Sequence, residues 1–149
     1  MPRVFAVACG VALIVGVACG RVDPSRRDPV EGPPHEAAQG NADAQYEMGV
    51  RIAGSPASAP DWAQAAGWFL RAADQGHAGA QSALAFMYHL GHGVPTSDIA
   101  AIMWLSLAAS QNVPEHDAYA LWREWIVQQA TPADVTEGDR LARAWRRSQ

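Results

Sequence analysis

The sequence contains no lysine, so all eleven of its basic residues are arginine. This excludes chemistry that depends on a lysine, including Schiff-base catalysis, the phosphate-loop lysine and Ser-Lys dyads. Fifteen acidic residues outnumber the basic ones and give a formal net charge of -4 at pH 7. We expect no nucleic-acid partner, because such proteins carry a positive surface that meets the phosphates.

Cysteine is scarce, and both copies, Cys9 and Cys19, lie in the first twenty residues. The rest of the chain therefore has no disulfide, thiolate metal site or cysteine nucleophile. The catalytic patterns G-x-S-x-G and H-E-x-x-H are also missing, and no two carboxylates are evidently paired. We predict that the protein is not an enzyme, with no catalytic residue, cofactor or metal.

The first residues are typical of an export signal. Arg3 precedes an apolar run over residues 4–18, which is shorter than the roughly twenty residues of a membrane-spanning helix. The run ends in V-G-V-A-C at residues 15–19, which resembles the bacterial lipobox, with Gly16 where leucine is usual. The resemblance implies that residues 1–18 are removed and that Cys19 becomes an acylated N-terminus. The alternatives are cleavage after Gly20 and an uncleaved anchor.

Acylation of Cys19 would place the protein on the periplasmic face of a bacterial membrane as a lipoprotein, whereas cleavage after Gly20 would leave it soluble in the periplasm or secreted. Residues 19–35 contain two Asp-Pro pairs and one Pro-Pro pair with few aliphatic residues. Such a segment buries too little surface to fold, so we predict a disordered tether. A processed prosegment is the alternative.

Residues 36–149 predict an all-α domain, because apolar residues recur at helical spacing and no run alternates with period two. The segment also repeats itself after 36 residues. Ala44-Gln45 matches Ala80-Gln81, and Trp68-Phe69 matches Trp104-Leu105. This period indicates a short α-solenoid of stacked helical hairpins. Three hairpins are predicted, with their helices at 36–53 and 61–75, 78–90 and 97–110, and 115–130 and 132–147.

Local signals support these boundaries. Asp61 and Ser97 are good N-caps, Gly76 is a C-terminal stop, and Thr131 stands before a proline at a first helical position. We therefore expect helices to begin or end at these four residues.

The family resemblance rests on three motifs in order. Residues 72–81 read A-A-D-Q-G-H-A-G-A-Q, residues 88–94 read Y-H-L-G-H-G-V, and Asp98, Ala101 and Trp104 follow. This order resembles the Sel-one-like repeat, a relative of the tetratricopeptide repeat. The resemblance covers about residues 37–147, including a second junction at 40–45 and a closing helix at 131–145. The first repeat departs from the pattern because residues 53–60 replace its G-x-G-V turn.

The resemblance and the helical spacing together predict which residues face the core. Ala44, Met48 and Ile52 are expected to face inward on the first helix. The large aromatic residues are expected to be core as well, with an aromatic ligand platform as the alternative. These residues are Trp68, Trp104, Trp122, Trp125 and Trp145.

Positions one or two residues further along on this helix, with their counterparts in the second and third hairpins, should lie on a different, concave side. They are Tyr46, Val50, Ala53, Ser82, Phe86, His89, Ala120, Glu124 and Val127. Among them we predict Tyr46, Val50, Phe86, His89 and Glu124 as partner-binding residues, because partly exposed aromatics beside polar groups are typical of binding hot spots. The alternative for Phe86 is packing between neighbouring hairpins.

His89 and His92 form an H-x-x-H pair that could ligate zinc, but no third ligand stands at a defined spacing, which favours structural roles. The sequence thus predicts an exported, membrane-anchored helical-repeat scaffold that binds a protein or peptide partner. The alternative is a cell-wall or small-ligand binding module, or a hydrolase, using a groove between hairpins. A deep polar pocket or a strongly perturbed pKa would favour that alternative.

Overall fold

The computed structural model describes residues 35–55 and 60–149. The predicted signal peptide, Cys19 and the tether up to residue 34 lie outside these ranges. The described residues belong to one unit that begins at Pro33. They form helices and contain no strand. Within the same ranges, no helix is long and apolar enough to cross a membrane.

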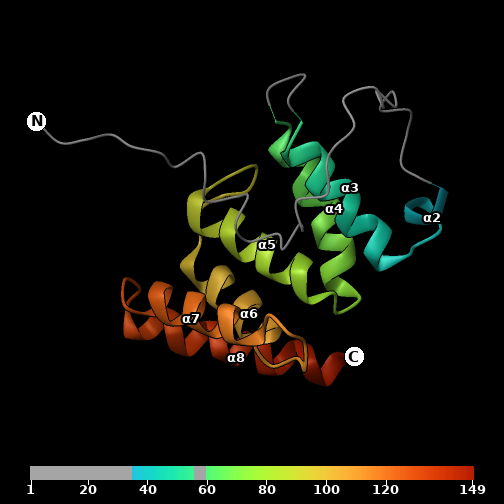
Figure 1. The fold of residues 1–149 in the computed structure, drawn as a ribbon. Coiled ribbons are helices and arrows are strands. Elements are labelled where there is room, and N and C mark those ends of the chain that lie inside the picture. Colours follow the sequence, from blue (N-terminus) through green and yellow to red (C-terminus); the bar gives the residue numbers. More distant parts are fainter. Residues whose placement is uncertain (1–34, 56–59) are drawn as a thin grey trace, which may run out of the picture. The chain divides into compact units, whose positions relative to one another are not determined.

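The helices run in the predicted order (Figure 1). Their bounds are α2 (His35–Ala38), α3 (Ala42–Ala53), α4 (Trp62–Asp74), α5 (Ala78–Leu90), α6 (Asp98–Ala108), α7 (His116–Val127) and α8 (Pro132–Ser148). The predicted first helix at 36–53 is wrong in one respect, because it breaks into α2 and α3. Gly40 adopts a φ of 95° at the break, a conformation that ends a helix, and Asn41 caps the new one.

Side-chain caps set the start of most helices. Asp61, Ser97 and Thr131 accept hydrogen bonds from backbone N–H groups three residues ahead, as predicted, at 2.9, 3.2 and 3.2 Å. Asn41 caps α3 in the same way. At the equivalent position of the second repeat, the Nδ1 atom of His77 accepts from Ala80 N at 3.1 Å. His77 is therefore a helix cap.

The first four long helices stack as predicted, with α3 packed on α4, α4 on α5 and α5 on α6. Alanines that are fully buried let the helix axes approach, and large side chains fill the space between them. Ala44, Met48 and Ile52 are buried, which confirms the predicted inward face of α3. Trp104 is 5% exposed and also confirmed as core.

A glutamine network repeats with the same 36-residue period. In the first repeat, Gln45 Nε2 donates to Ala37 O at 3.2 Å and Gln75 Nε2 donates to Gln45 Oε1 at 2.8 Å. The second repeat makes the same bonds 36 residues later, from Gln81 to Ala73 O at 3.2 Å and from Gln111 to Gln81 at 2.8 Å. These bonds satisfy buried amides and backbone carbonyls where one repeat joins the next.

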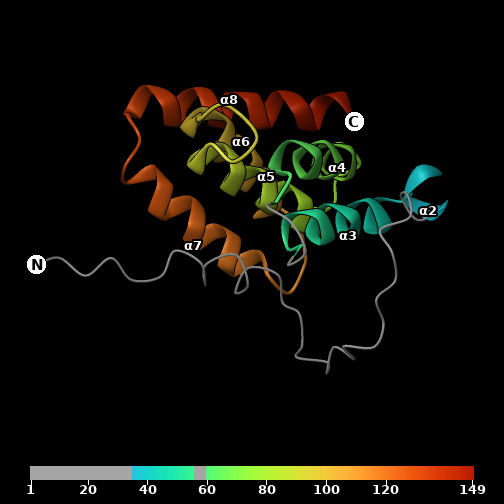
Figure 2. The same cartoon turned by 90° about the horizontal axis from the view of Figure 1, so that it is seen from above.

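The third pair of helices is built differently from the first two. Both α7 and α8 pack on α6, but they lack the extensive mutual packing of α3 with α4 and of α5 with α6. Figure 2 shows α7 and α8 diverging from the loop that joins them. The close approach of α8 occurs at Gly138, where a Cβ atom would lie 2.9 Å from Ile99 O and from Ile102 Cγ2. The predicted third hairpin is therefore splayed.

Candidate interaction surface

The predicted partner-binding residues of α3 are half-buried. The Tyr46 ring stacks on His77 with centroids 4.5 Å apart and lies 5.7 Å from the Phe69 ring. Burial raises the pKa of the Tyr46 phenol, and the negative charge of Glu115 adds to this effect. Val50 packs against the core one turn later. Both side chains therefore contribute to the packing of the fold, and part of each side chain remains exposed to solvent.

On α5, Phe86 packs toward α7. Its ring centroid lies 5.7 Å from that of Trp122 and 6.2 Å from that of His92. Phe86 therefore packs between neighbouring helices, which was the alternative to a binding role in the sequence analysis. Its side chain nevertheless remains partly exposed. Ser82, expected on the concave side, is 2% exposed, so that expectation is wrong. The close stacking of α5 between α4 and α6 turns Ser82 inward.

His89 lies one turn after Phe86 and connects two further elements. Its Nδ1 atom lies 2.9 Å from Asp98 Oδ1 at the start of α6. Its ring meets the Trp125 ring of α7 edge-on, with centroids 5.1 Å apart. His92 instead stacks on Trp62 at 4.7 Å, so the two histidines of the H-x-x-H pair have different partners. No group of three potential metal ligands occurs among the described residues.

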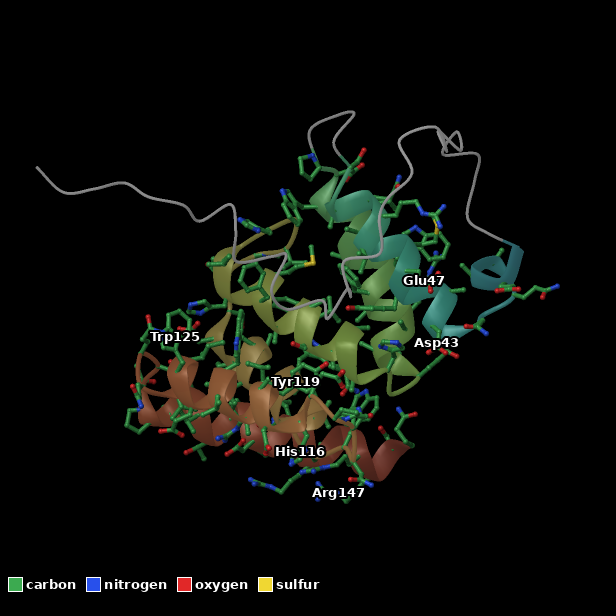
Figure 3. The ribbon with its side chains drawn as sticks, in the orientation of Figure 1. Asp43, Glu47, His116, Tyr119, Trp125 and Arg147 are labelled. Atoms are coloured by element: carbon green, nitrogen blue, oxygen red, sulfur yellow. The ribbon has the colours of Figure 1, made fainter. Side chains whose placement is uncertain are left out.

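Helix α7 carries the largest departure from the sequence prediction. Trp125 was expected in the core, but it is 53% exposed and lies at the outer edge of α7 in Figure 3. Leu121, one turn earlier, is 71% exposed, and Glu124 beside them is exposed as well. The reason is the splayed third pair, because α8 packs on α6 and leaves this side of α7 open. Leu121 and Trp125 thus join the candidate surface.

The other predicted core tryptophans lie at the edges of the core. Trp68, Trp122 and Trp145 are partly buried and pack against it. Trp68 also supports the guanidinium of Arg71, 4.7 Å from the ring centroid, and Trp145 meets the Trp104 ring edge-on at 6.3 Å.

Tyr119 is buried on α7, and Tyr46 of α3 lies near it. Burial, together with the negative charge of Glu115 and the neighbouring Tyr46, raises the pKa of Tyr119 to about 12. The phenol therefore stays neutral well above physiological pH. Its role is packing.

A polar network joins α6, α7 and α8. Arg123 Nη2 donates to both carboxylate oxygens of Asp139 at 2.7 and 2.8 Å, and Arg123 Nε donates to Ser106 Oγ at 2.7 Å. Ser106 in turn donates to Asp139 at 3.0 Å. The network fixes the rotation of α7, since Arg123 can reach Asp139 only from the side of α7 opposite Leu121 and Trp125.

The repeat geometry agrees with a known family. The family model of the Sel1 repeat matches residues 42–77 and 78–113. The chain contains two Sel1 repeats. Each match begins at the first residue of α3 or α5, and the Gln45 and Gln81 networks mark the same junctions in both Sel1 repeats. The third pair, α7 and α8, lies beyond the matched residues.

Solved structures support the same fold. One is a protective antigen present in uropathogenic Escherichia coli strains that displays an SLR fold. It aligns with a TM-score of 0.66 and 25% identity over 73% of this chain. The alignment spans 23% of that antigen, so the present chain corresponds to a small part of it.

The second is a Sel1 repeat protein from Oxalobacter formigenes, with a TM-score of 0.52 and 22% identity. This alignment covers 76% of the present chain and all of the other. No curated protein matches the sequence.

Proposed function

We propose that this Sel1 repeat chain is an exported scaffold, anchored to a membrane through a lipid on Cys19, that binds a protein or peptide partner. The binding surface is formed by α3, α5 and α7. Stacked helical repeats support this proposal because their function is recognition along an extended surface. The proposed contact residues are Tyr46, Val50, Phe86, His89 and Glu124, together with Leu121 and Trp125.

The observation that carries the proposal is the exposure of Leu121 and Trp125 on one side of α7. Large apolar side chains that adjoin each other on a protein surface are characteristic of interaction sites. Trp125 is also held by His89, one of the residues proposed from the sequence. The surface therefore combines an apolar anchor with neighbouring polar groups, as hot spots do.

Anchoring rests on the sequence alone. The apolar run at residues 4–18 is followed directly by Cys19, and the proline-containing segment after it provides a spacer. Such an anchor would hold the repeats near the membrane and present them to partners in the same compartment.

The test is site-specific photo-crosslinking in the producing bacterium. A photoreactive amino acid replaces Trp125 or Glu124 in the intact chain, and the control position is Thr136, which is exposed on α8. Photochemistry is needed because the absence of lysine leaves amine-reactive reagents no side-chain target. We expect one discrete crosslinked protein from positions 124 and 125 and none from position 136. Equal crosslinking from all three positions, or none, would contradict the proposal.

A further inference from the structure

One side of α7 presents a continuous row of exposed side chains. Tyr119 and Ile126 turn into the core. The exposed positions follow the spacing i, i+4, i+7, i+8 and i+11, which places them on one face of a helix. We call this row the α7 stripe, and it consists of Asp117, Leu121, Glu124, Trp125 and Gln128. It extends for about 16 Å along the helix at ~1.5 Å per residue.

The apolar part of the stripe is held in place. Leu121 and Trp125 stand one turn apart and are therefore neighbours on the helix surface. The edge-on contact with His89 restrains the Trp125 indole, and His89 is itself fixed by Asp98 at 2.9 Å. A restrained aromatic side chain loses little conformational entropy when a partner binds. The apolar part of the stripe is thus preorganised for binding in the free protein.

The charge of the stripe has one sign. Asp117 and Glu124 are exposed carboxylates, and the stripe contains no basic residue. The arginine of α7, Arg123, points to the other side and is bound by Asp139. His116 lies 2.9 Å from Asp117, and no ion pair forms at Glu124 within residues 35–55 and 60–149. An approaching partner therefore meets an apolar surface flanked by negative charge.

We propose that the α7 stripe binds an amphipathic helical segment of a protein partner that carries arginine or lysine beside leucine-like side chains. This inference rests on the proposed function and adds the chemistry of the partner. Cationic side chains would pair with Asp117 and Glu124 and lie over the indole face of Trp125, which attracts cations. Apolar side chains would pack on Leu121.

A helix is the conformation that fits the stripe. Contacts repeated at helical spacing along α7 match a partner whose own side chains recur at i, i+4 and i+7. In the first two pairs, α3 and α5 each pack on a second helix of their own pair, whereas α7 has no such extensive contact with α8. An added helix from a partner would give α7 that second neighbour.

The experiment measures binding of two designed peptides to the intact chain by fluorescence anisotropy. One peptide is a fluorescein-labelled helix of about four turns with arginine and leucine on one face. The other is identical except that every arginine is glutamate. We expect the arginine peptide to bind at least about tenfold more tightly at low salt, with the difference shrinking as salt screens the carboxylates.

Matched variants assign the effect to the stripe. The double variant Asp117→Asn and Glu124→Gln keeps the shape and removes the charge, so we expect it to erase most of the preference for arginine. Trp125→Ala should weaken binding of the arginine peptide about tenfold or more. Thr136→Ala on α8 should change nothing. Circular dichroism of each variant confirms the fold.

The contradicting outcomes are distinct. If both peptides bind equally well and Trp125→Ala abolishes this binding, the partner need not be cationic and the proposal is wrong. The α7 stripe would still be an interaction surface. If neither peptide binds, the proposed cationic helical partner is also wrong. The photo-crosslinking experiment tests the proposed function separately. If light scattering finds a dimer that Trp125→Ala dissociates, a second copy covers the stripe and the proposal is wrong.

Discussion

The ring of Phe69 fills the space that a side chain on residue 49 would occupy. A Cβ atom at Gly49 would lie 2.6 Å from both Cδ1 and Cε1 of Phe69, far inside van der Waals contact. Both residues are buried where α3 crosses α4. In the second repeat the equivalent positions, 36 residues later, are Ala85 and Leu105. The two Sel1 repeats thus fill the same site with different pairs of side chains.

We expect Gly49→Ala to lower the free energy of unfolding by up to about 2 kcal/mol. Overpacking costs roughly 1 to 3 kcal/mol, whereas replacing a helical glycine gains about 1 kcal/mol. Gly67→Ala in α4 is the matched control, because no atom lies within 4 Å of a Cβ there. That variant should be stabilised by up to about 1 kcal/mol. Urea unfolding measures both.

The double variant Gly49→Ala with Phe69→Leu reproduces the pair found in the second repeat. We expect it to be more stable than the sum of the two single changes, with a coupling of about 1 kcal/mol or more. Strict additivity would mean that the Phe69 ring moves aside without cost.

The stacked repeats were predictable because local chemistry repeats with them. The caps Asp61, Ser97 and Thr131 are visible in the sequence, and each makes the expected hydrogen bond. The glutamines at positions 75 and 111 also repeat in the sequence, but their hydrogen bonds were not predicted. The 36-residue shift then assigns α3 and α4 to one repeat and α5 and α6 to the next.

The exposure of Trp125 could not be predicted from the same information. Burial of a helix face depends on which neighbour covers it, and α8 packs on α6 rather than on α7. The signal available was Gly138, which admits the close approach of α8 to α6, but a single glycine does not reveal its partner. The break at Gly40 was missed although the 36-residue shift aligns Gly40 with Gly76, the predicted helix stop, and both glycines have a positive φ.

Trp104 and Trp125 should respond very differently to truncation. Trp104 is 5% exposed, so Trp104→Ala is expected to cost about 3 to 5 kcal/mol, enough to unfold a marginal domain. Trp125 is 53% exposed, so Trp125→Ala should cost less than about 1 kcal/mol. Thermal unfolding of the two variants measures the contrast. A comparable loss of stability in both would mean that Trp125 is covered in solution.

Acylation of Cys19 remains a prediction, because this residue lies outside the described ranges. Mass spectrometry of the membrane fraction should find a mature chain that begins at Cys19 with a diacylglyceryl group. Cys19→Ala should leave the protein unprocessed or soluble. A mature N-terminus at Arg21 would instead establish ordinary cleavage after Gly20.

The Asp139 carboxylate should make stability depend on pH. Burial alone raises the pKa of Asp139, but the hydrogen bonds from Arg123 and Ser106 and the charges of Arg123 and Arg143 outweigh it and hold the pKa below the ordinary aspartate value. The unfolded chain then binds a proton more readily than the folded chain. The stabilisation is therefore complete above the ordinary pKa and is lost as the pH falls through it toward the lowered value.

Asp139→Asn removes this titration and the bidentate pair together. At neutral pH we expect the variant to lose about 1 kcal/mol of stability. This is less than the roughly 1.5 to 3 kcal/mol of a buried charged hydrogen bond, because both side chains are partly exposed and solvent screens the pair. Urea midpoints recorded from about pH 7 down to about pH 3 should fall less steeply for the variant than for the natural chain. Glu137→Gln, which breaks the exposed pair with Arg140, is the control and should have a smaller effect at neutral pH. Parallel pH profiles for the natural chain and Asp139→Asn would mean that Arg123 does not hold the carboxylate in solution, and that α7 is free to rotate on α6.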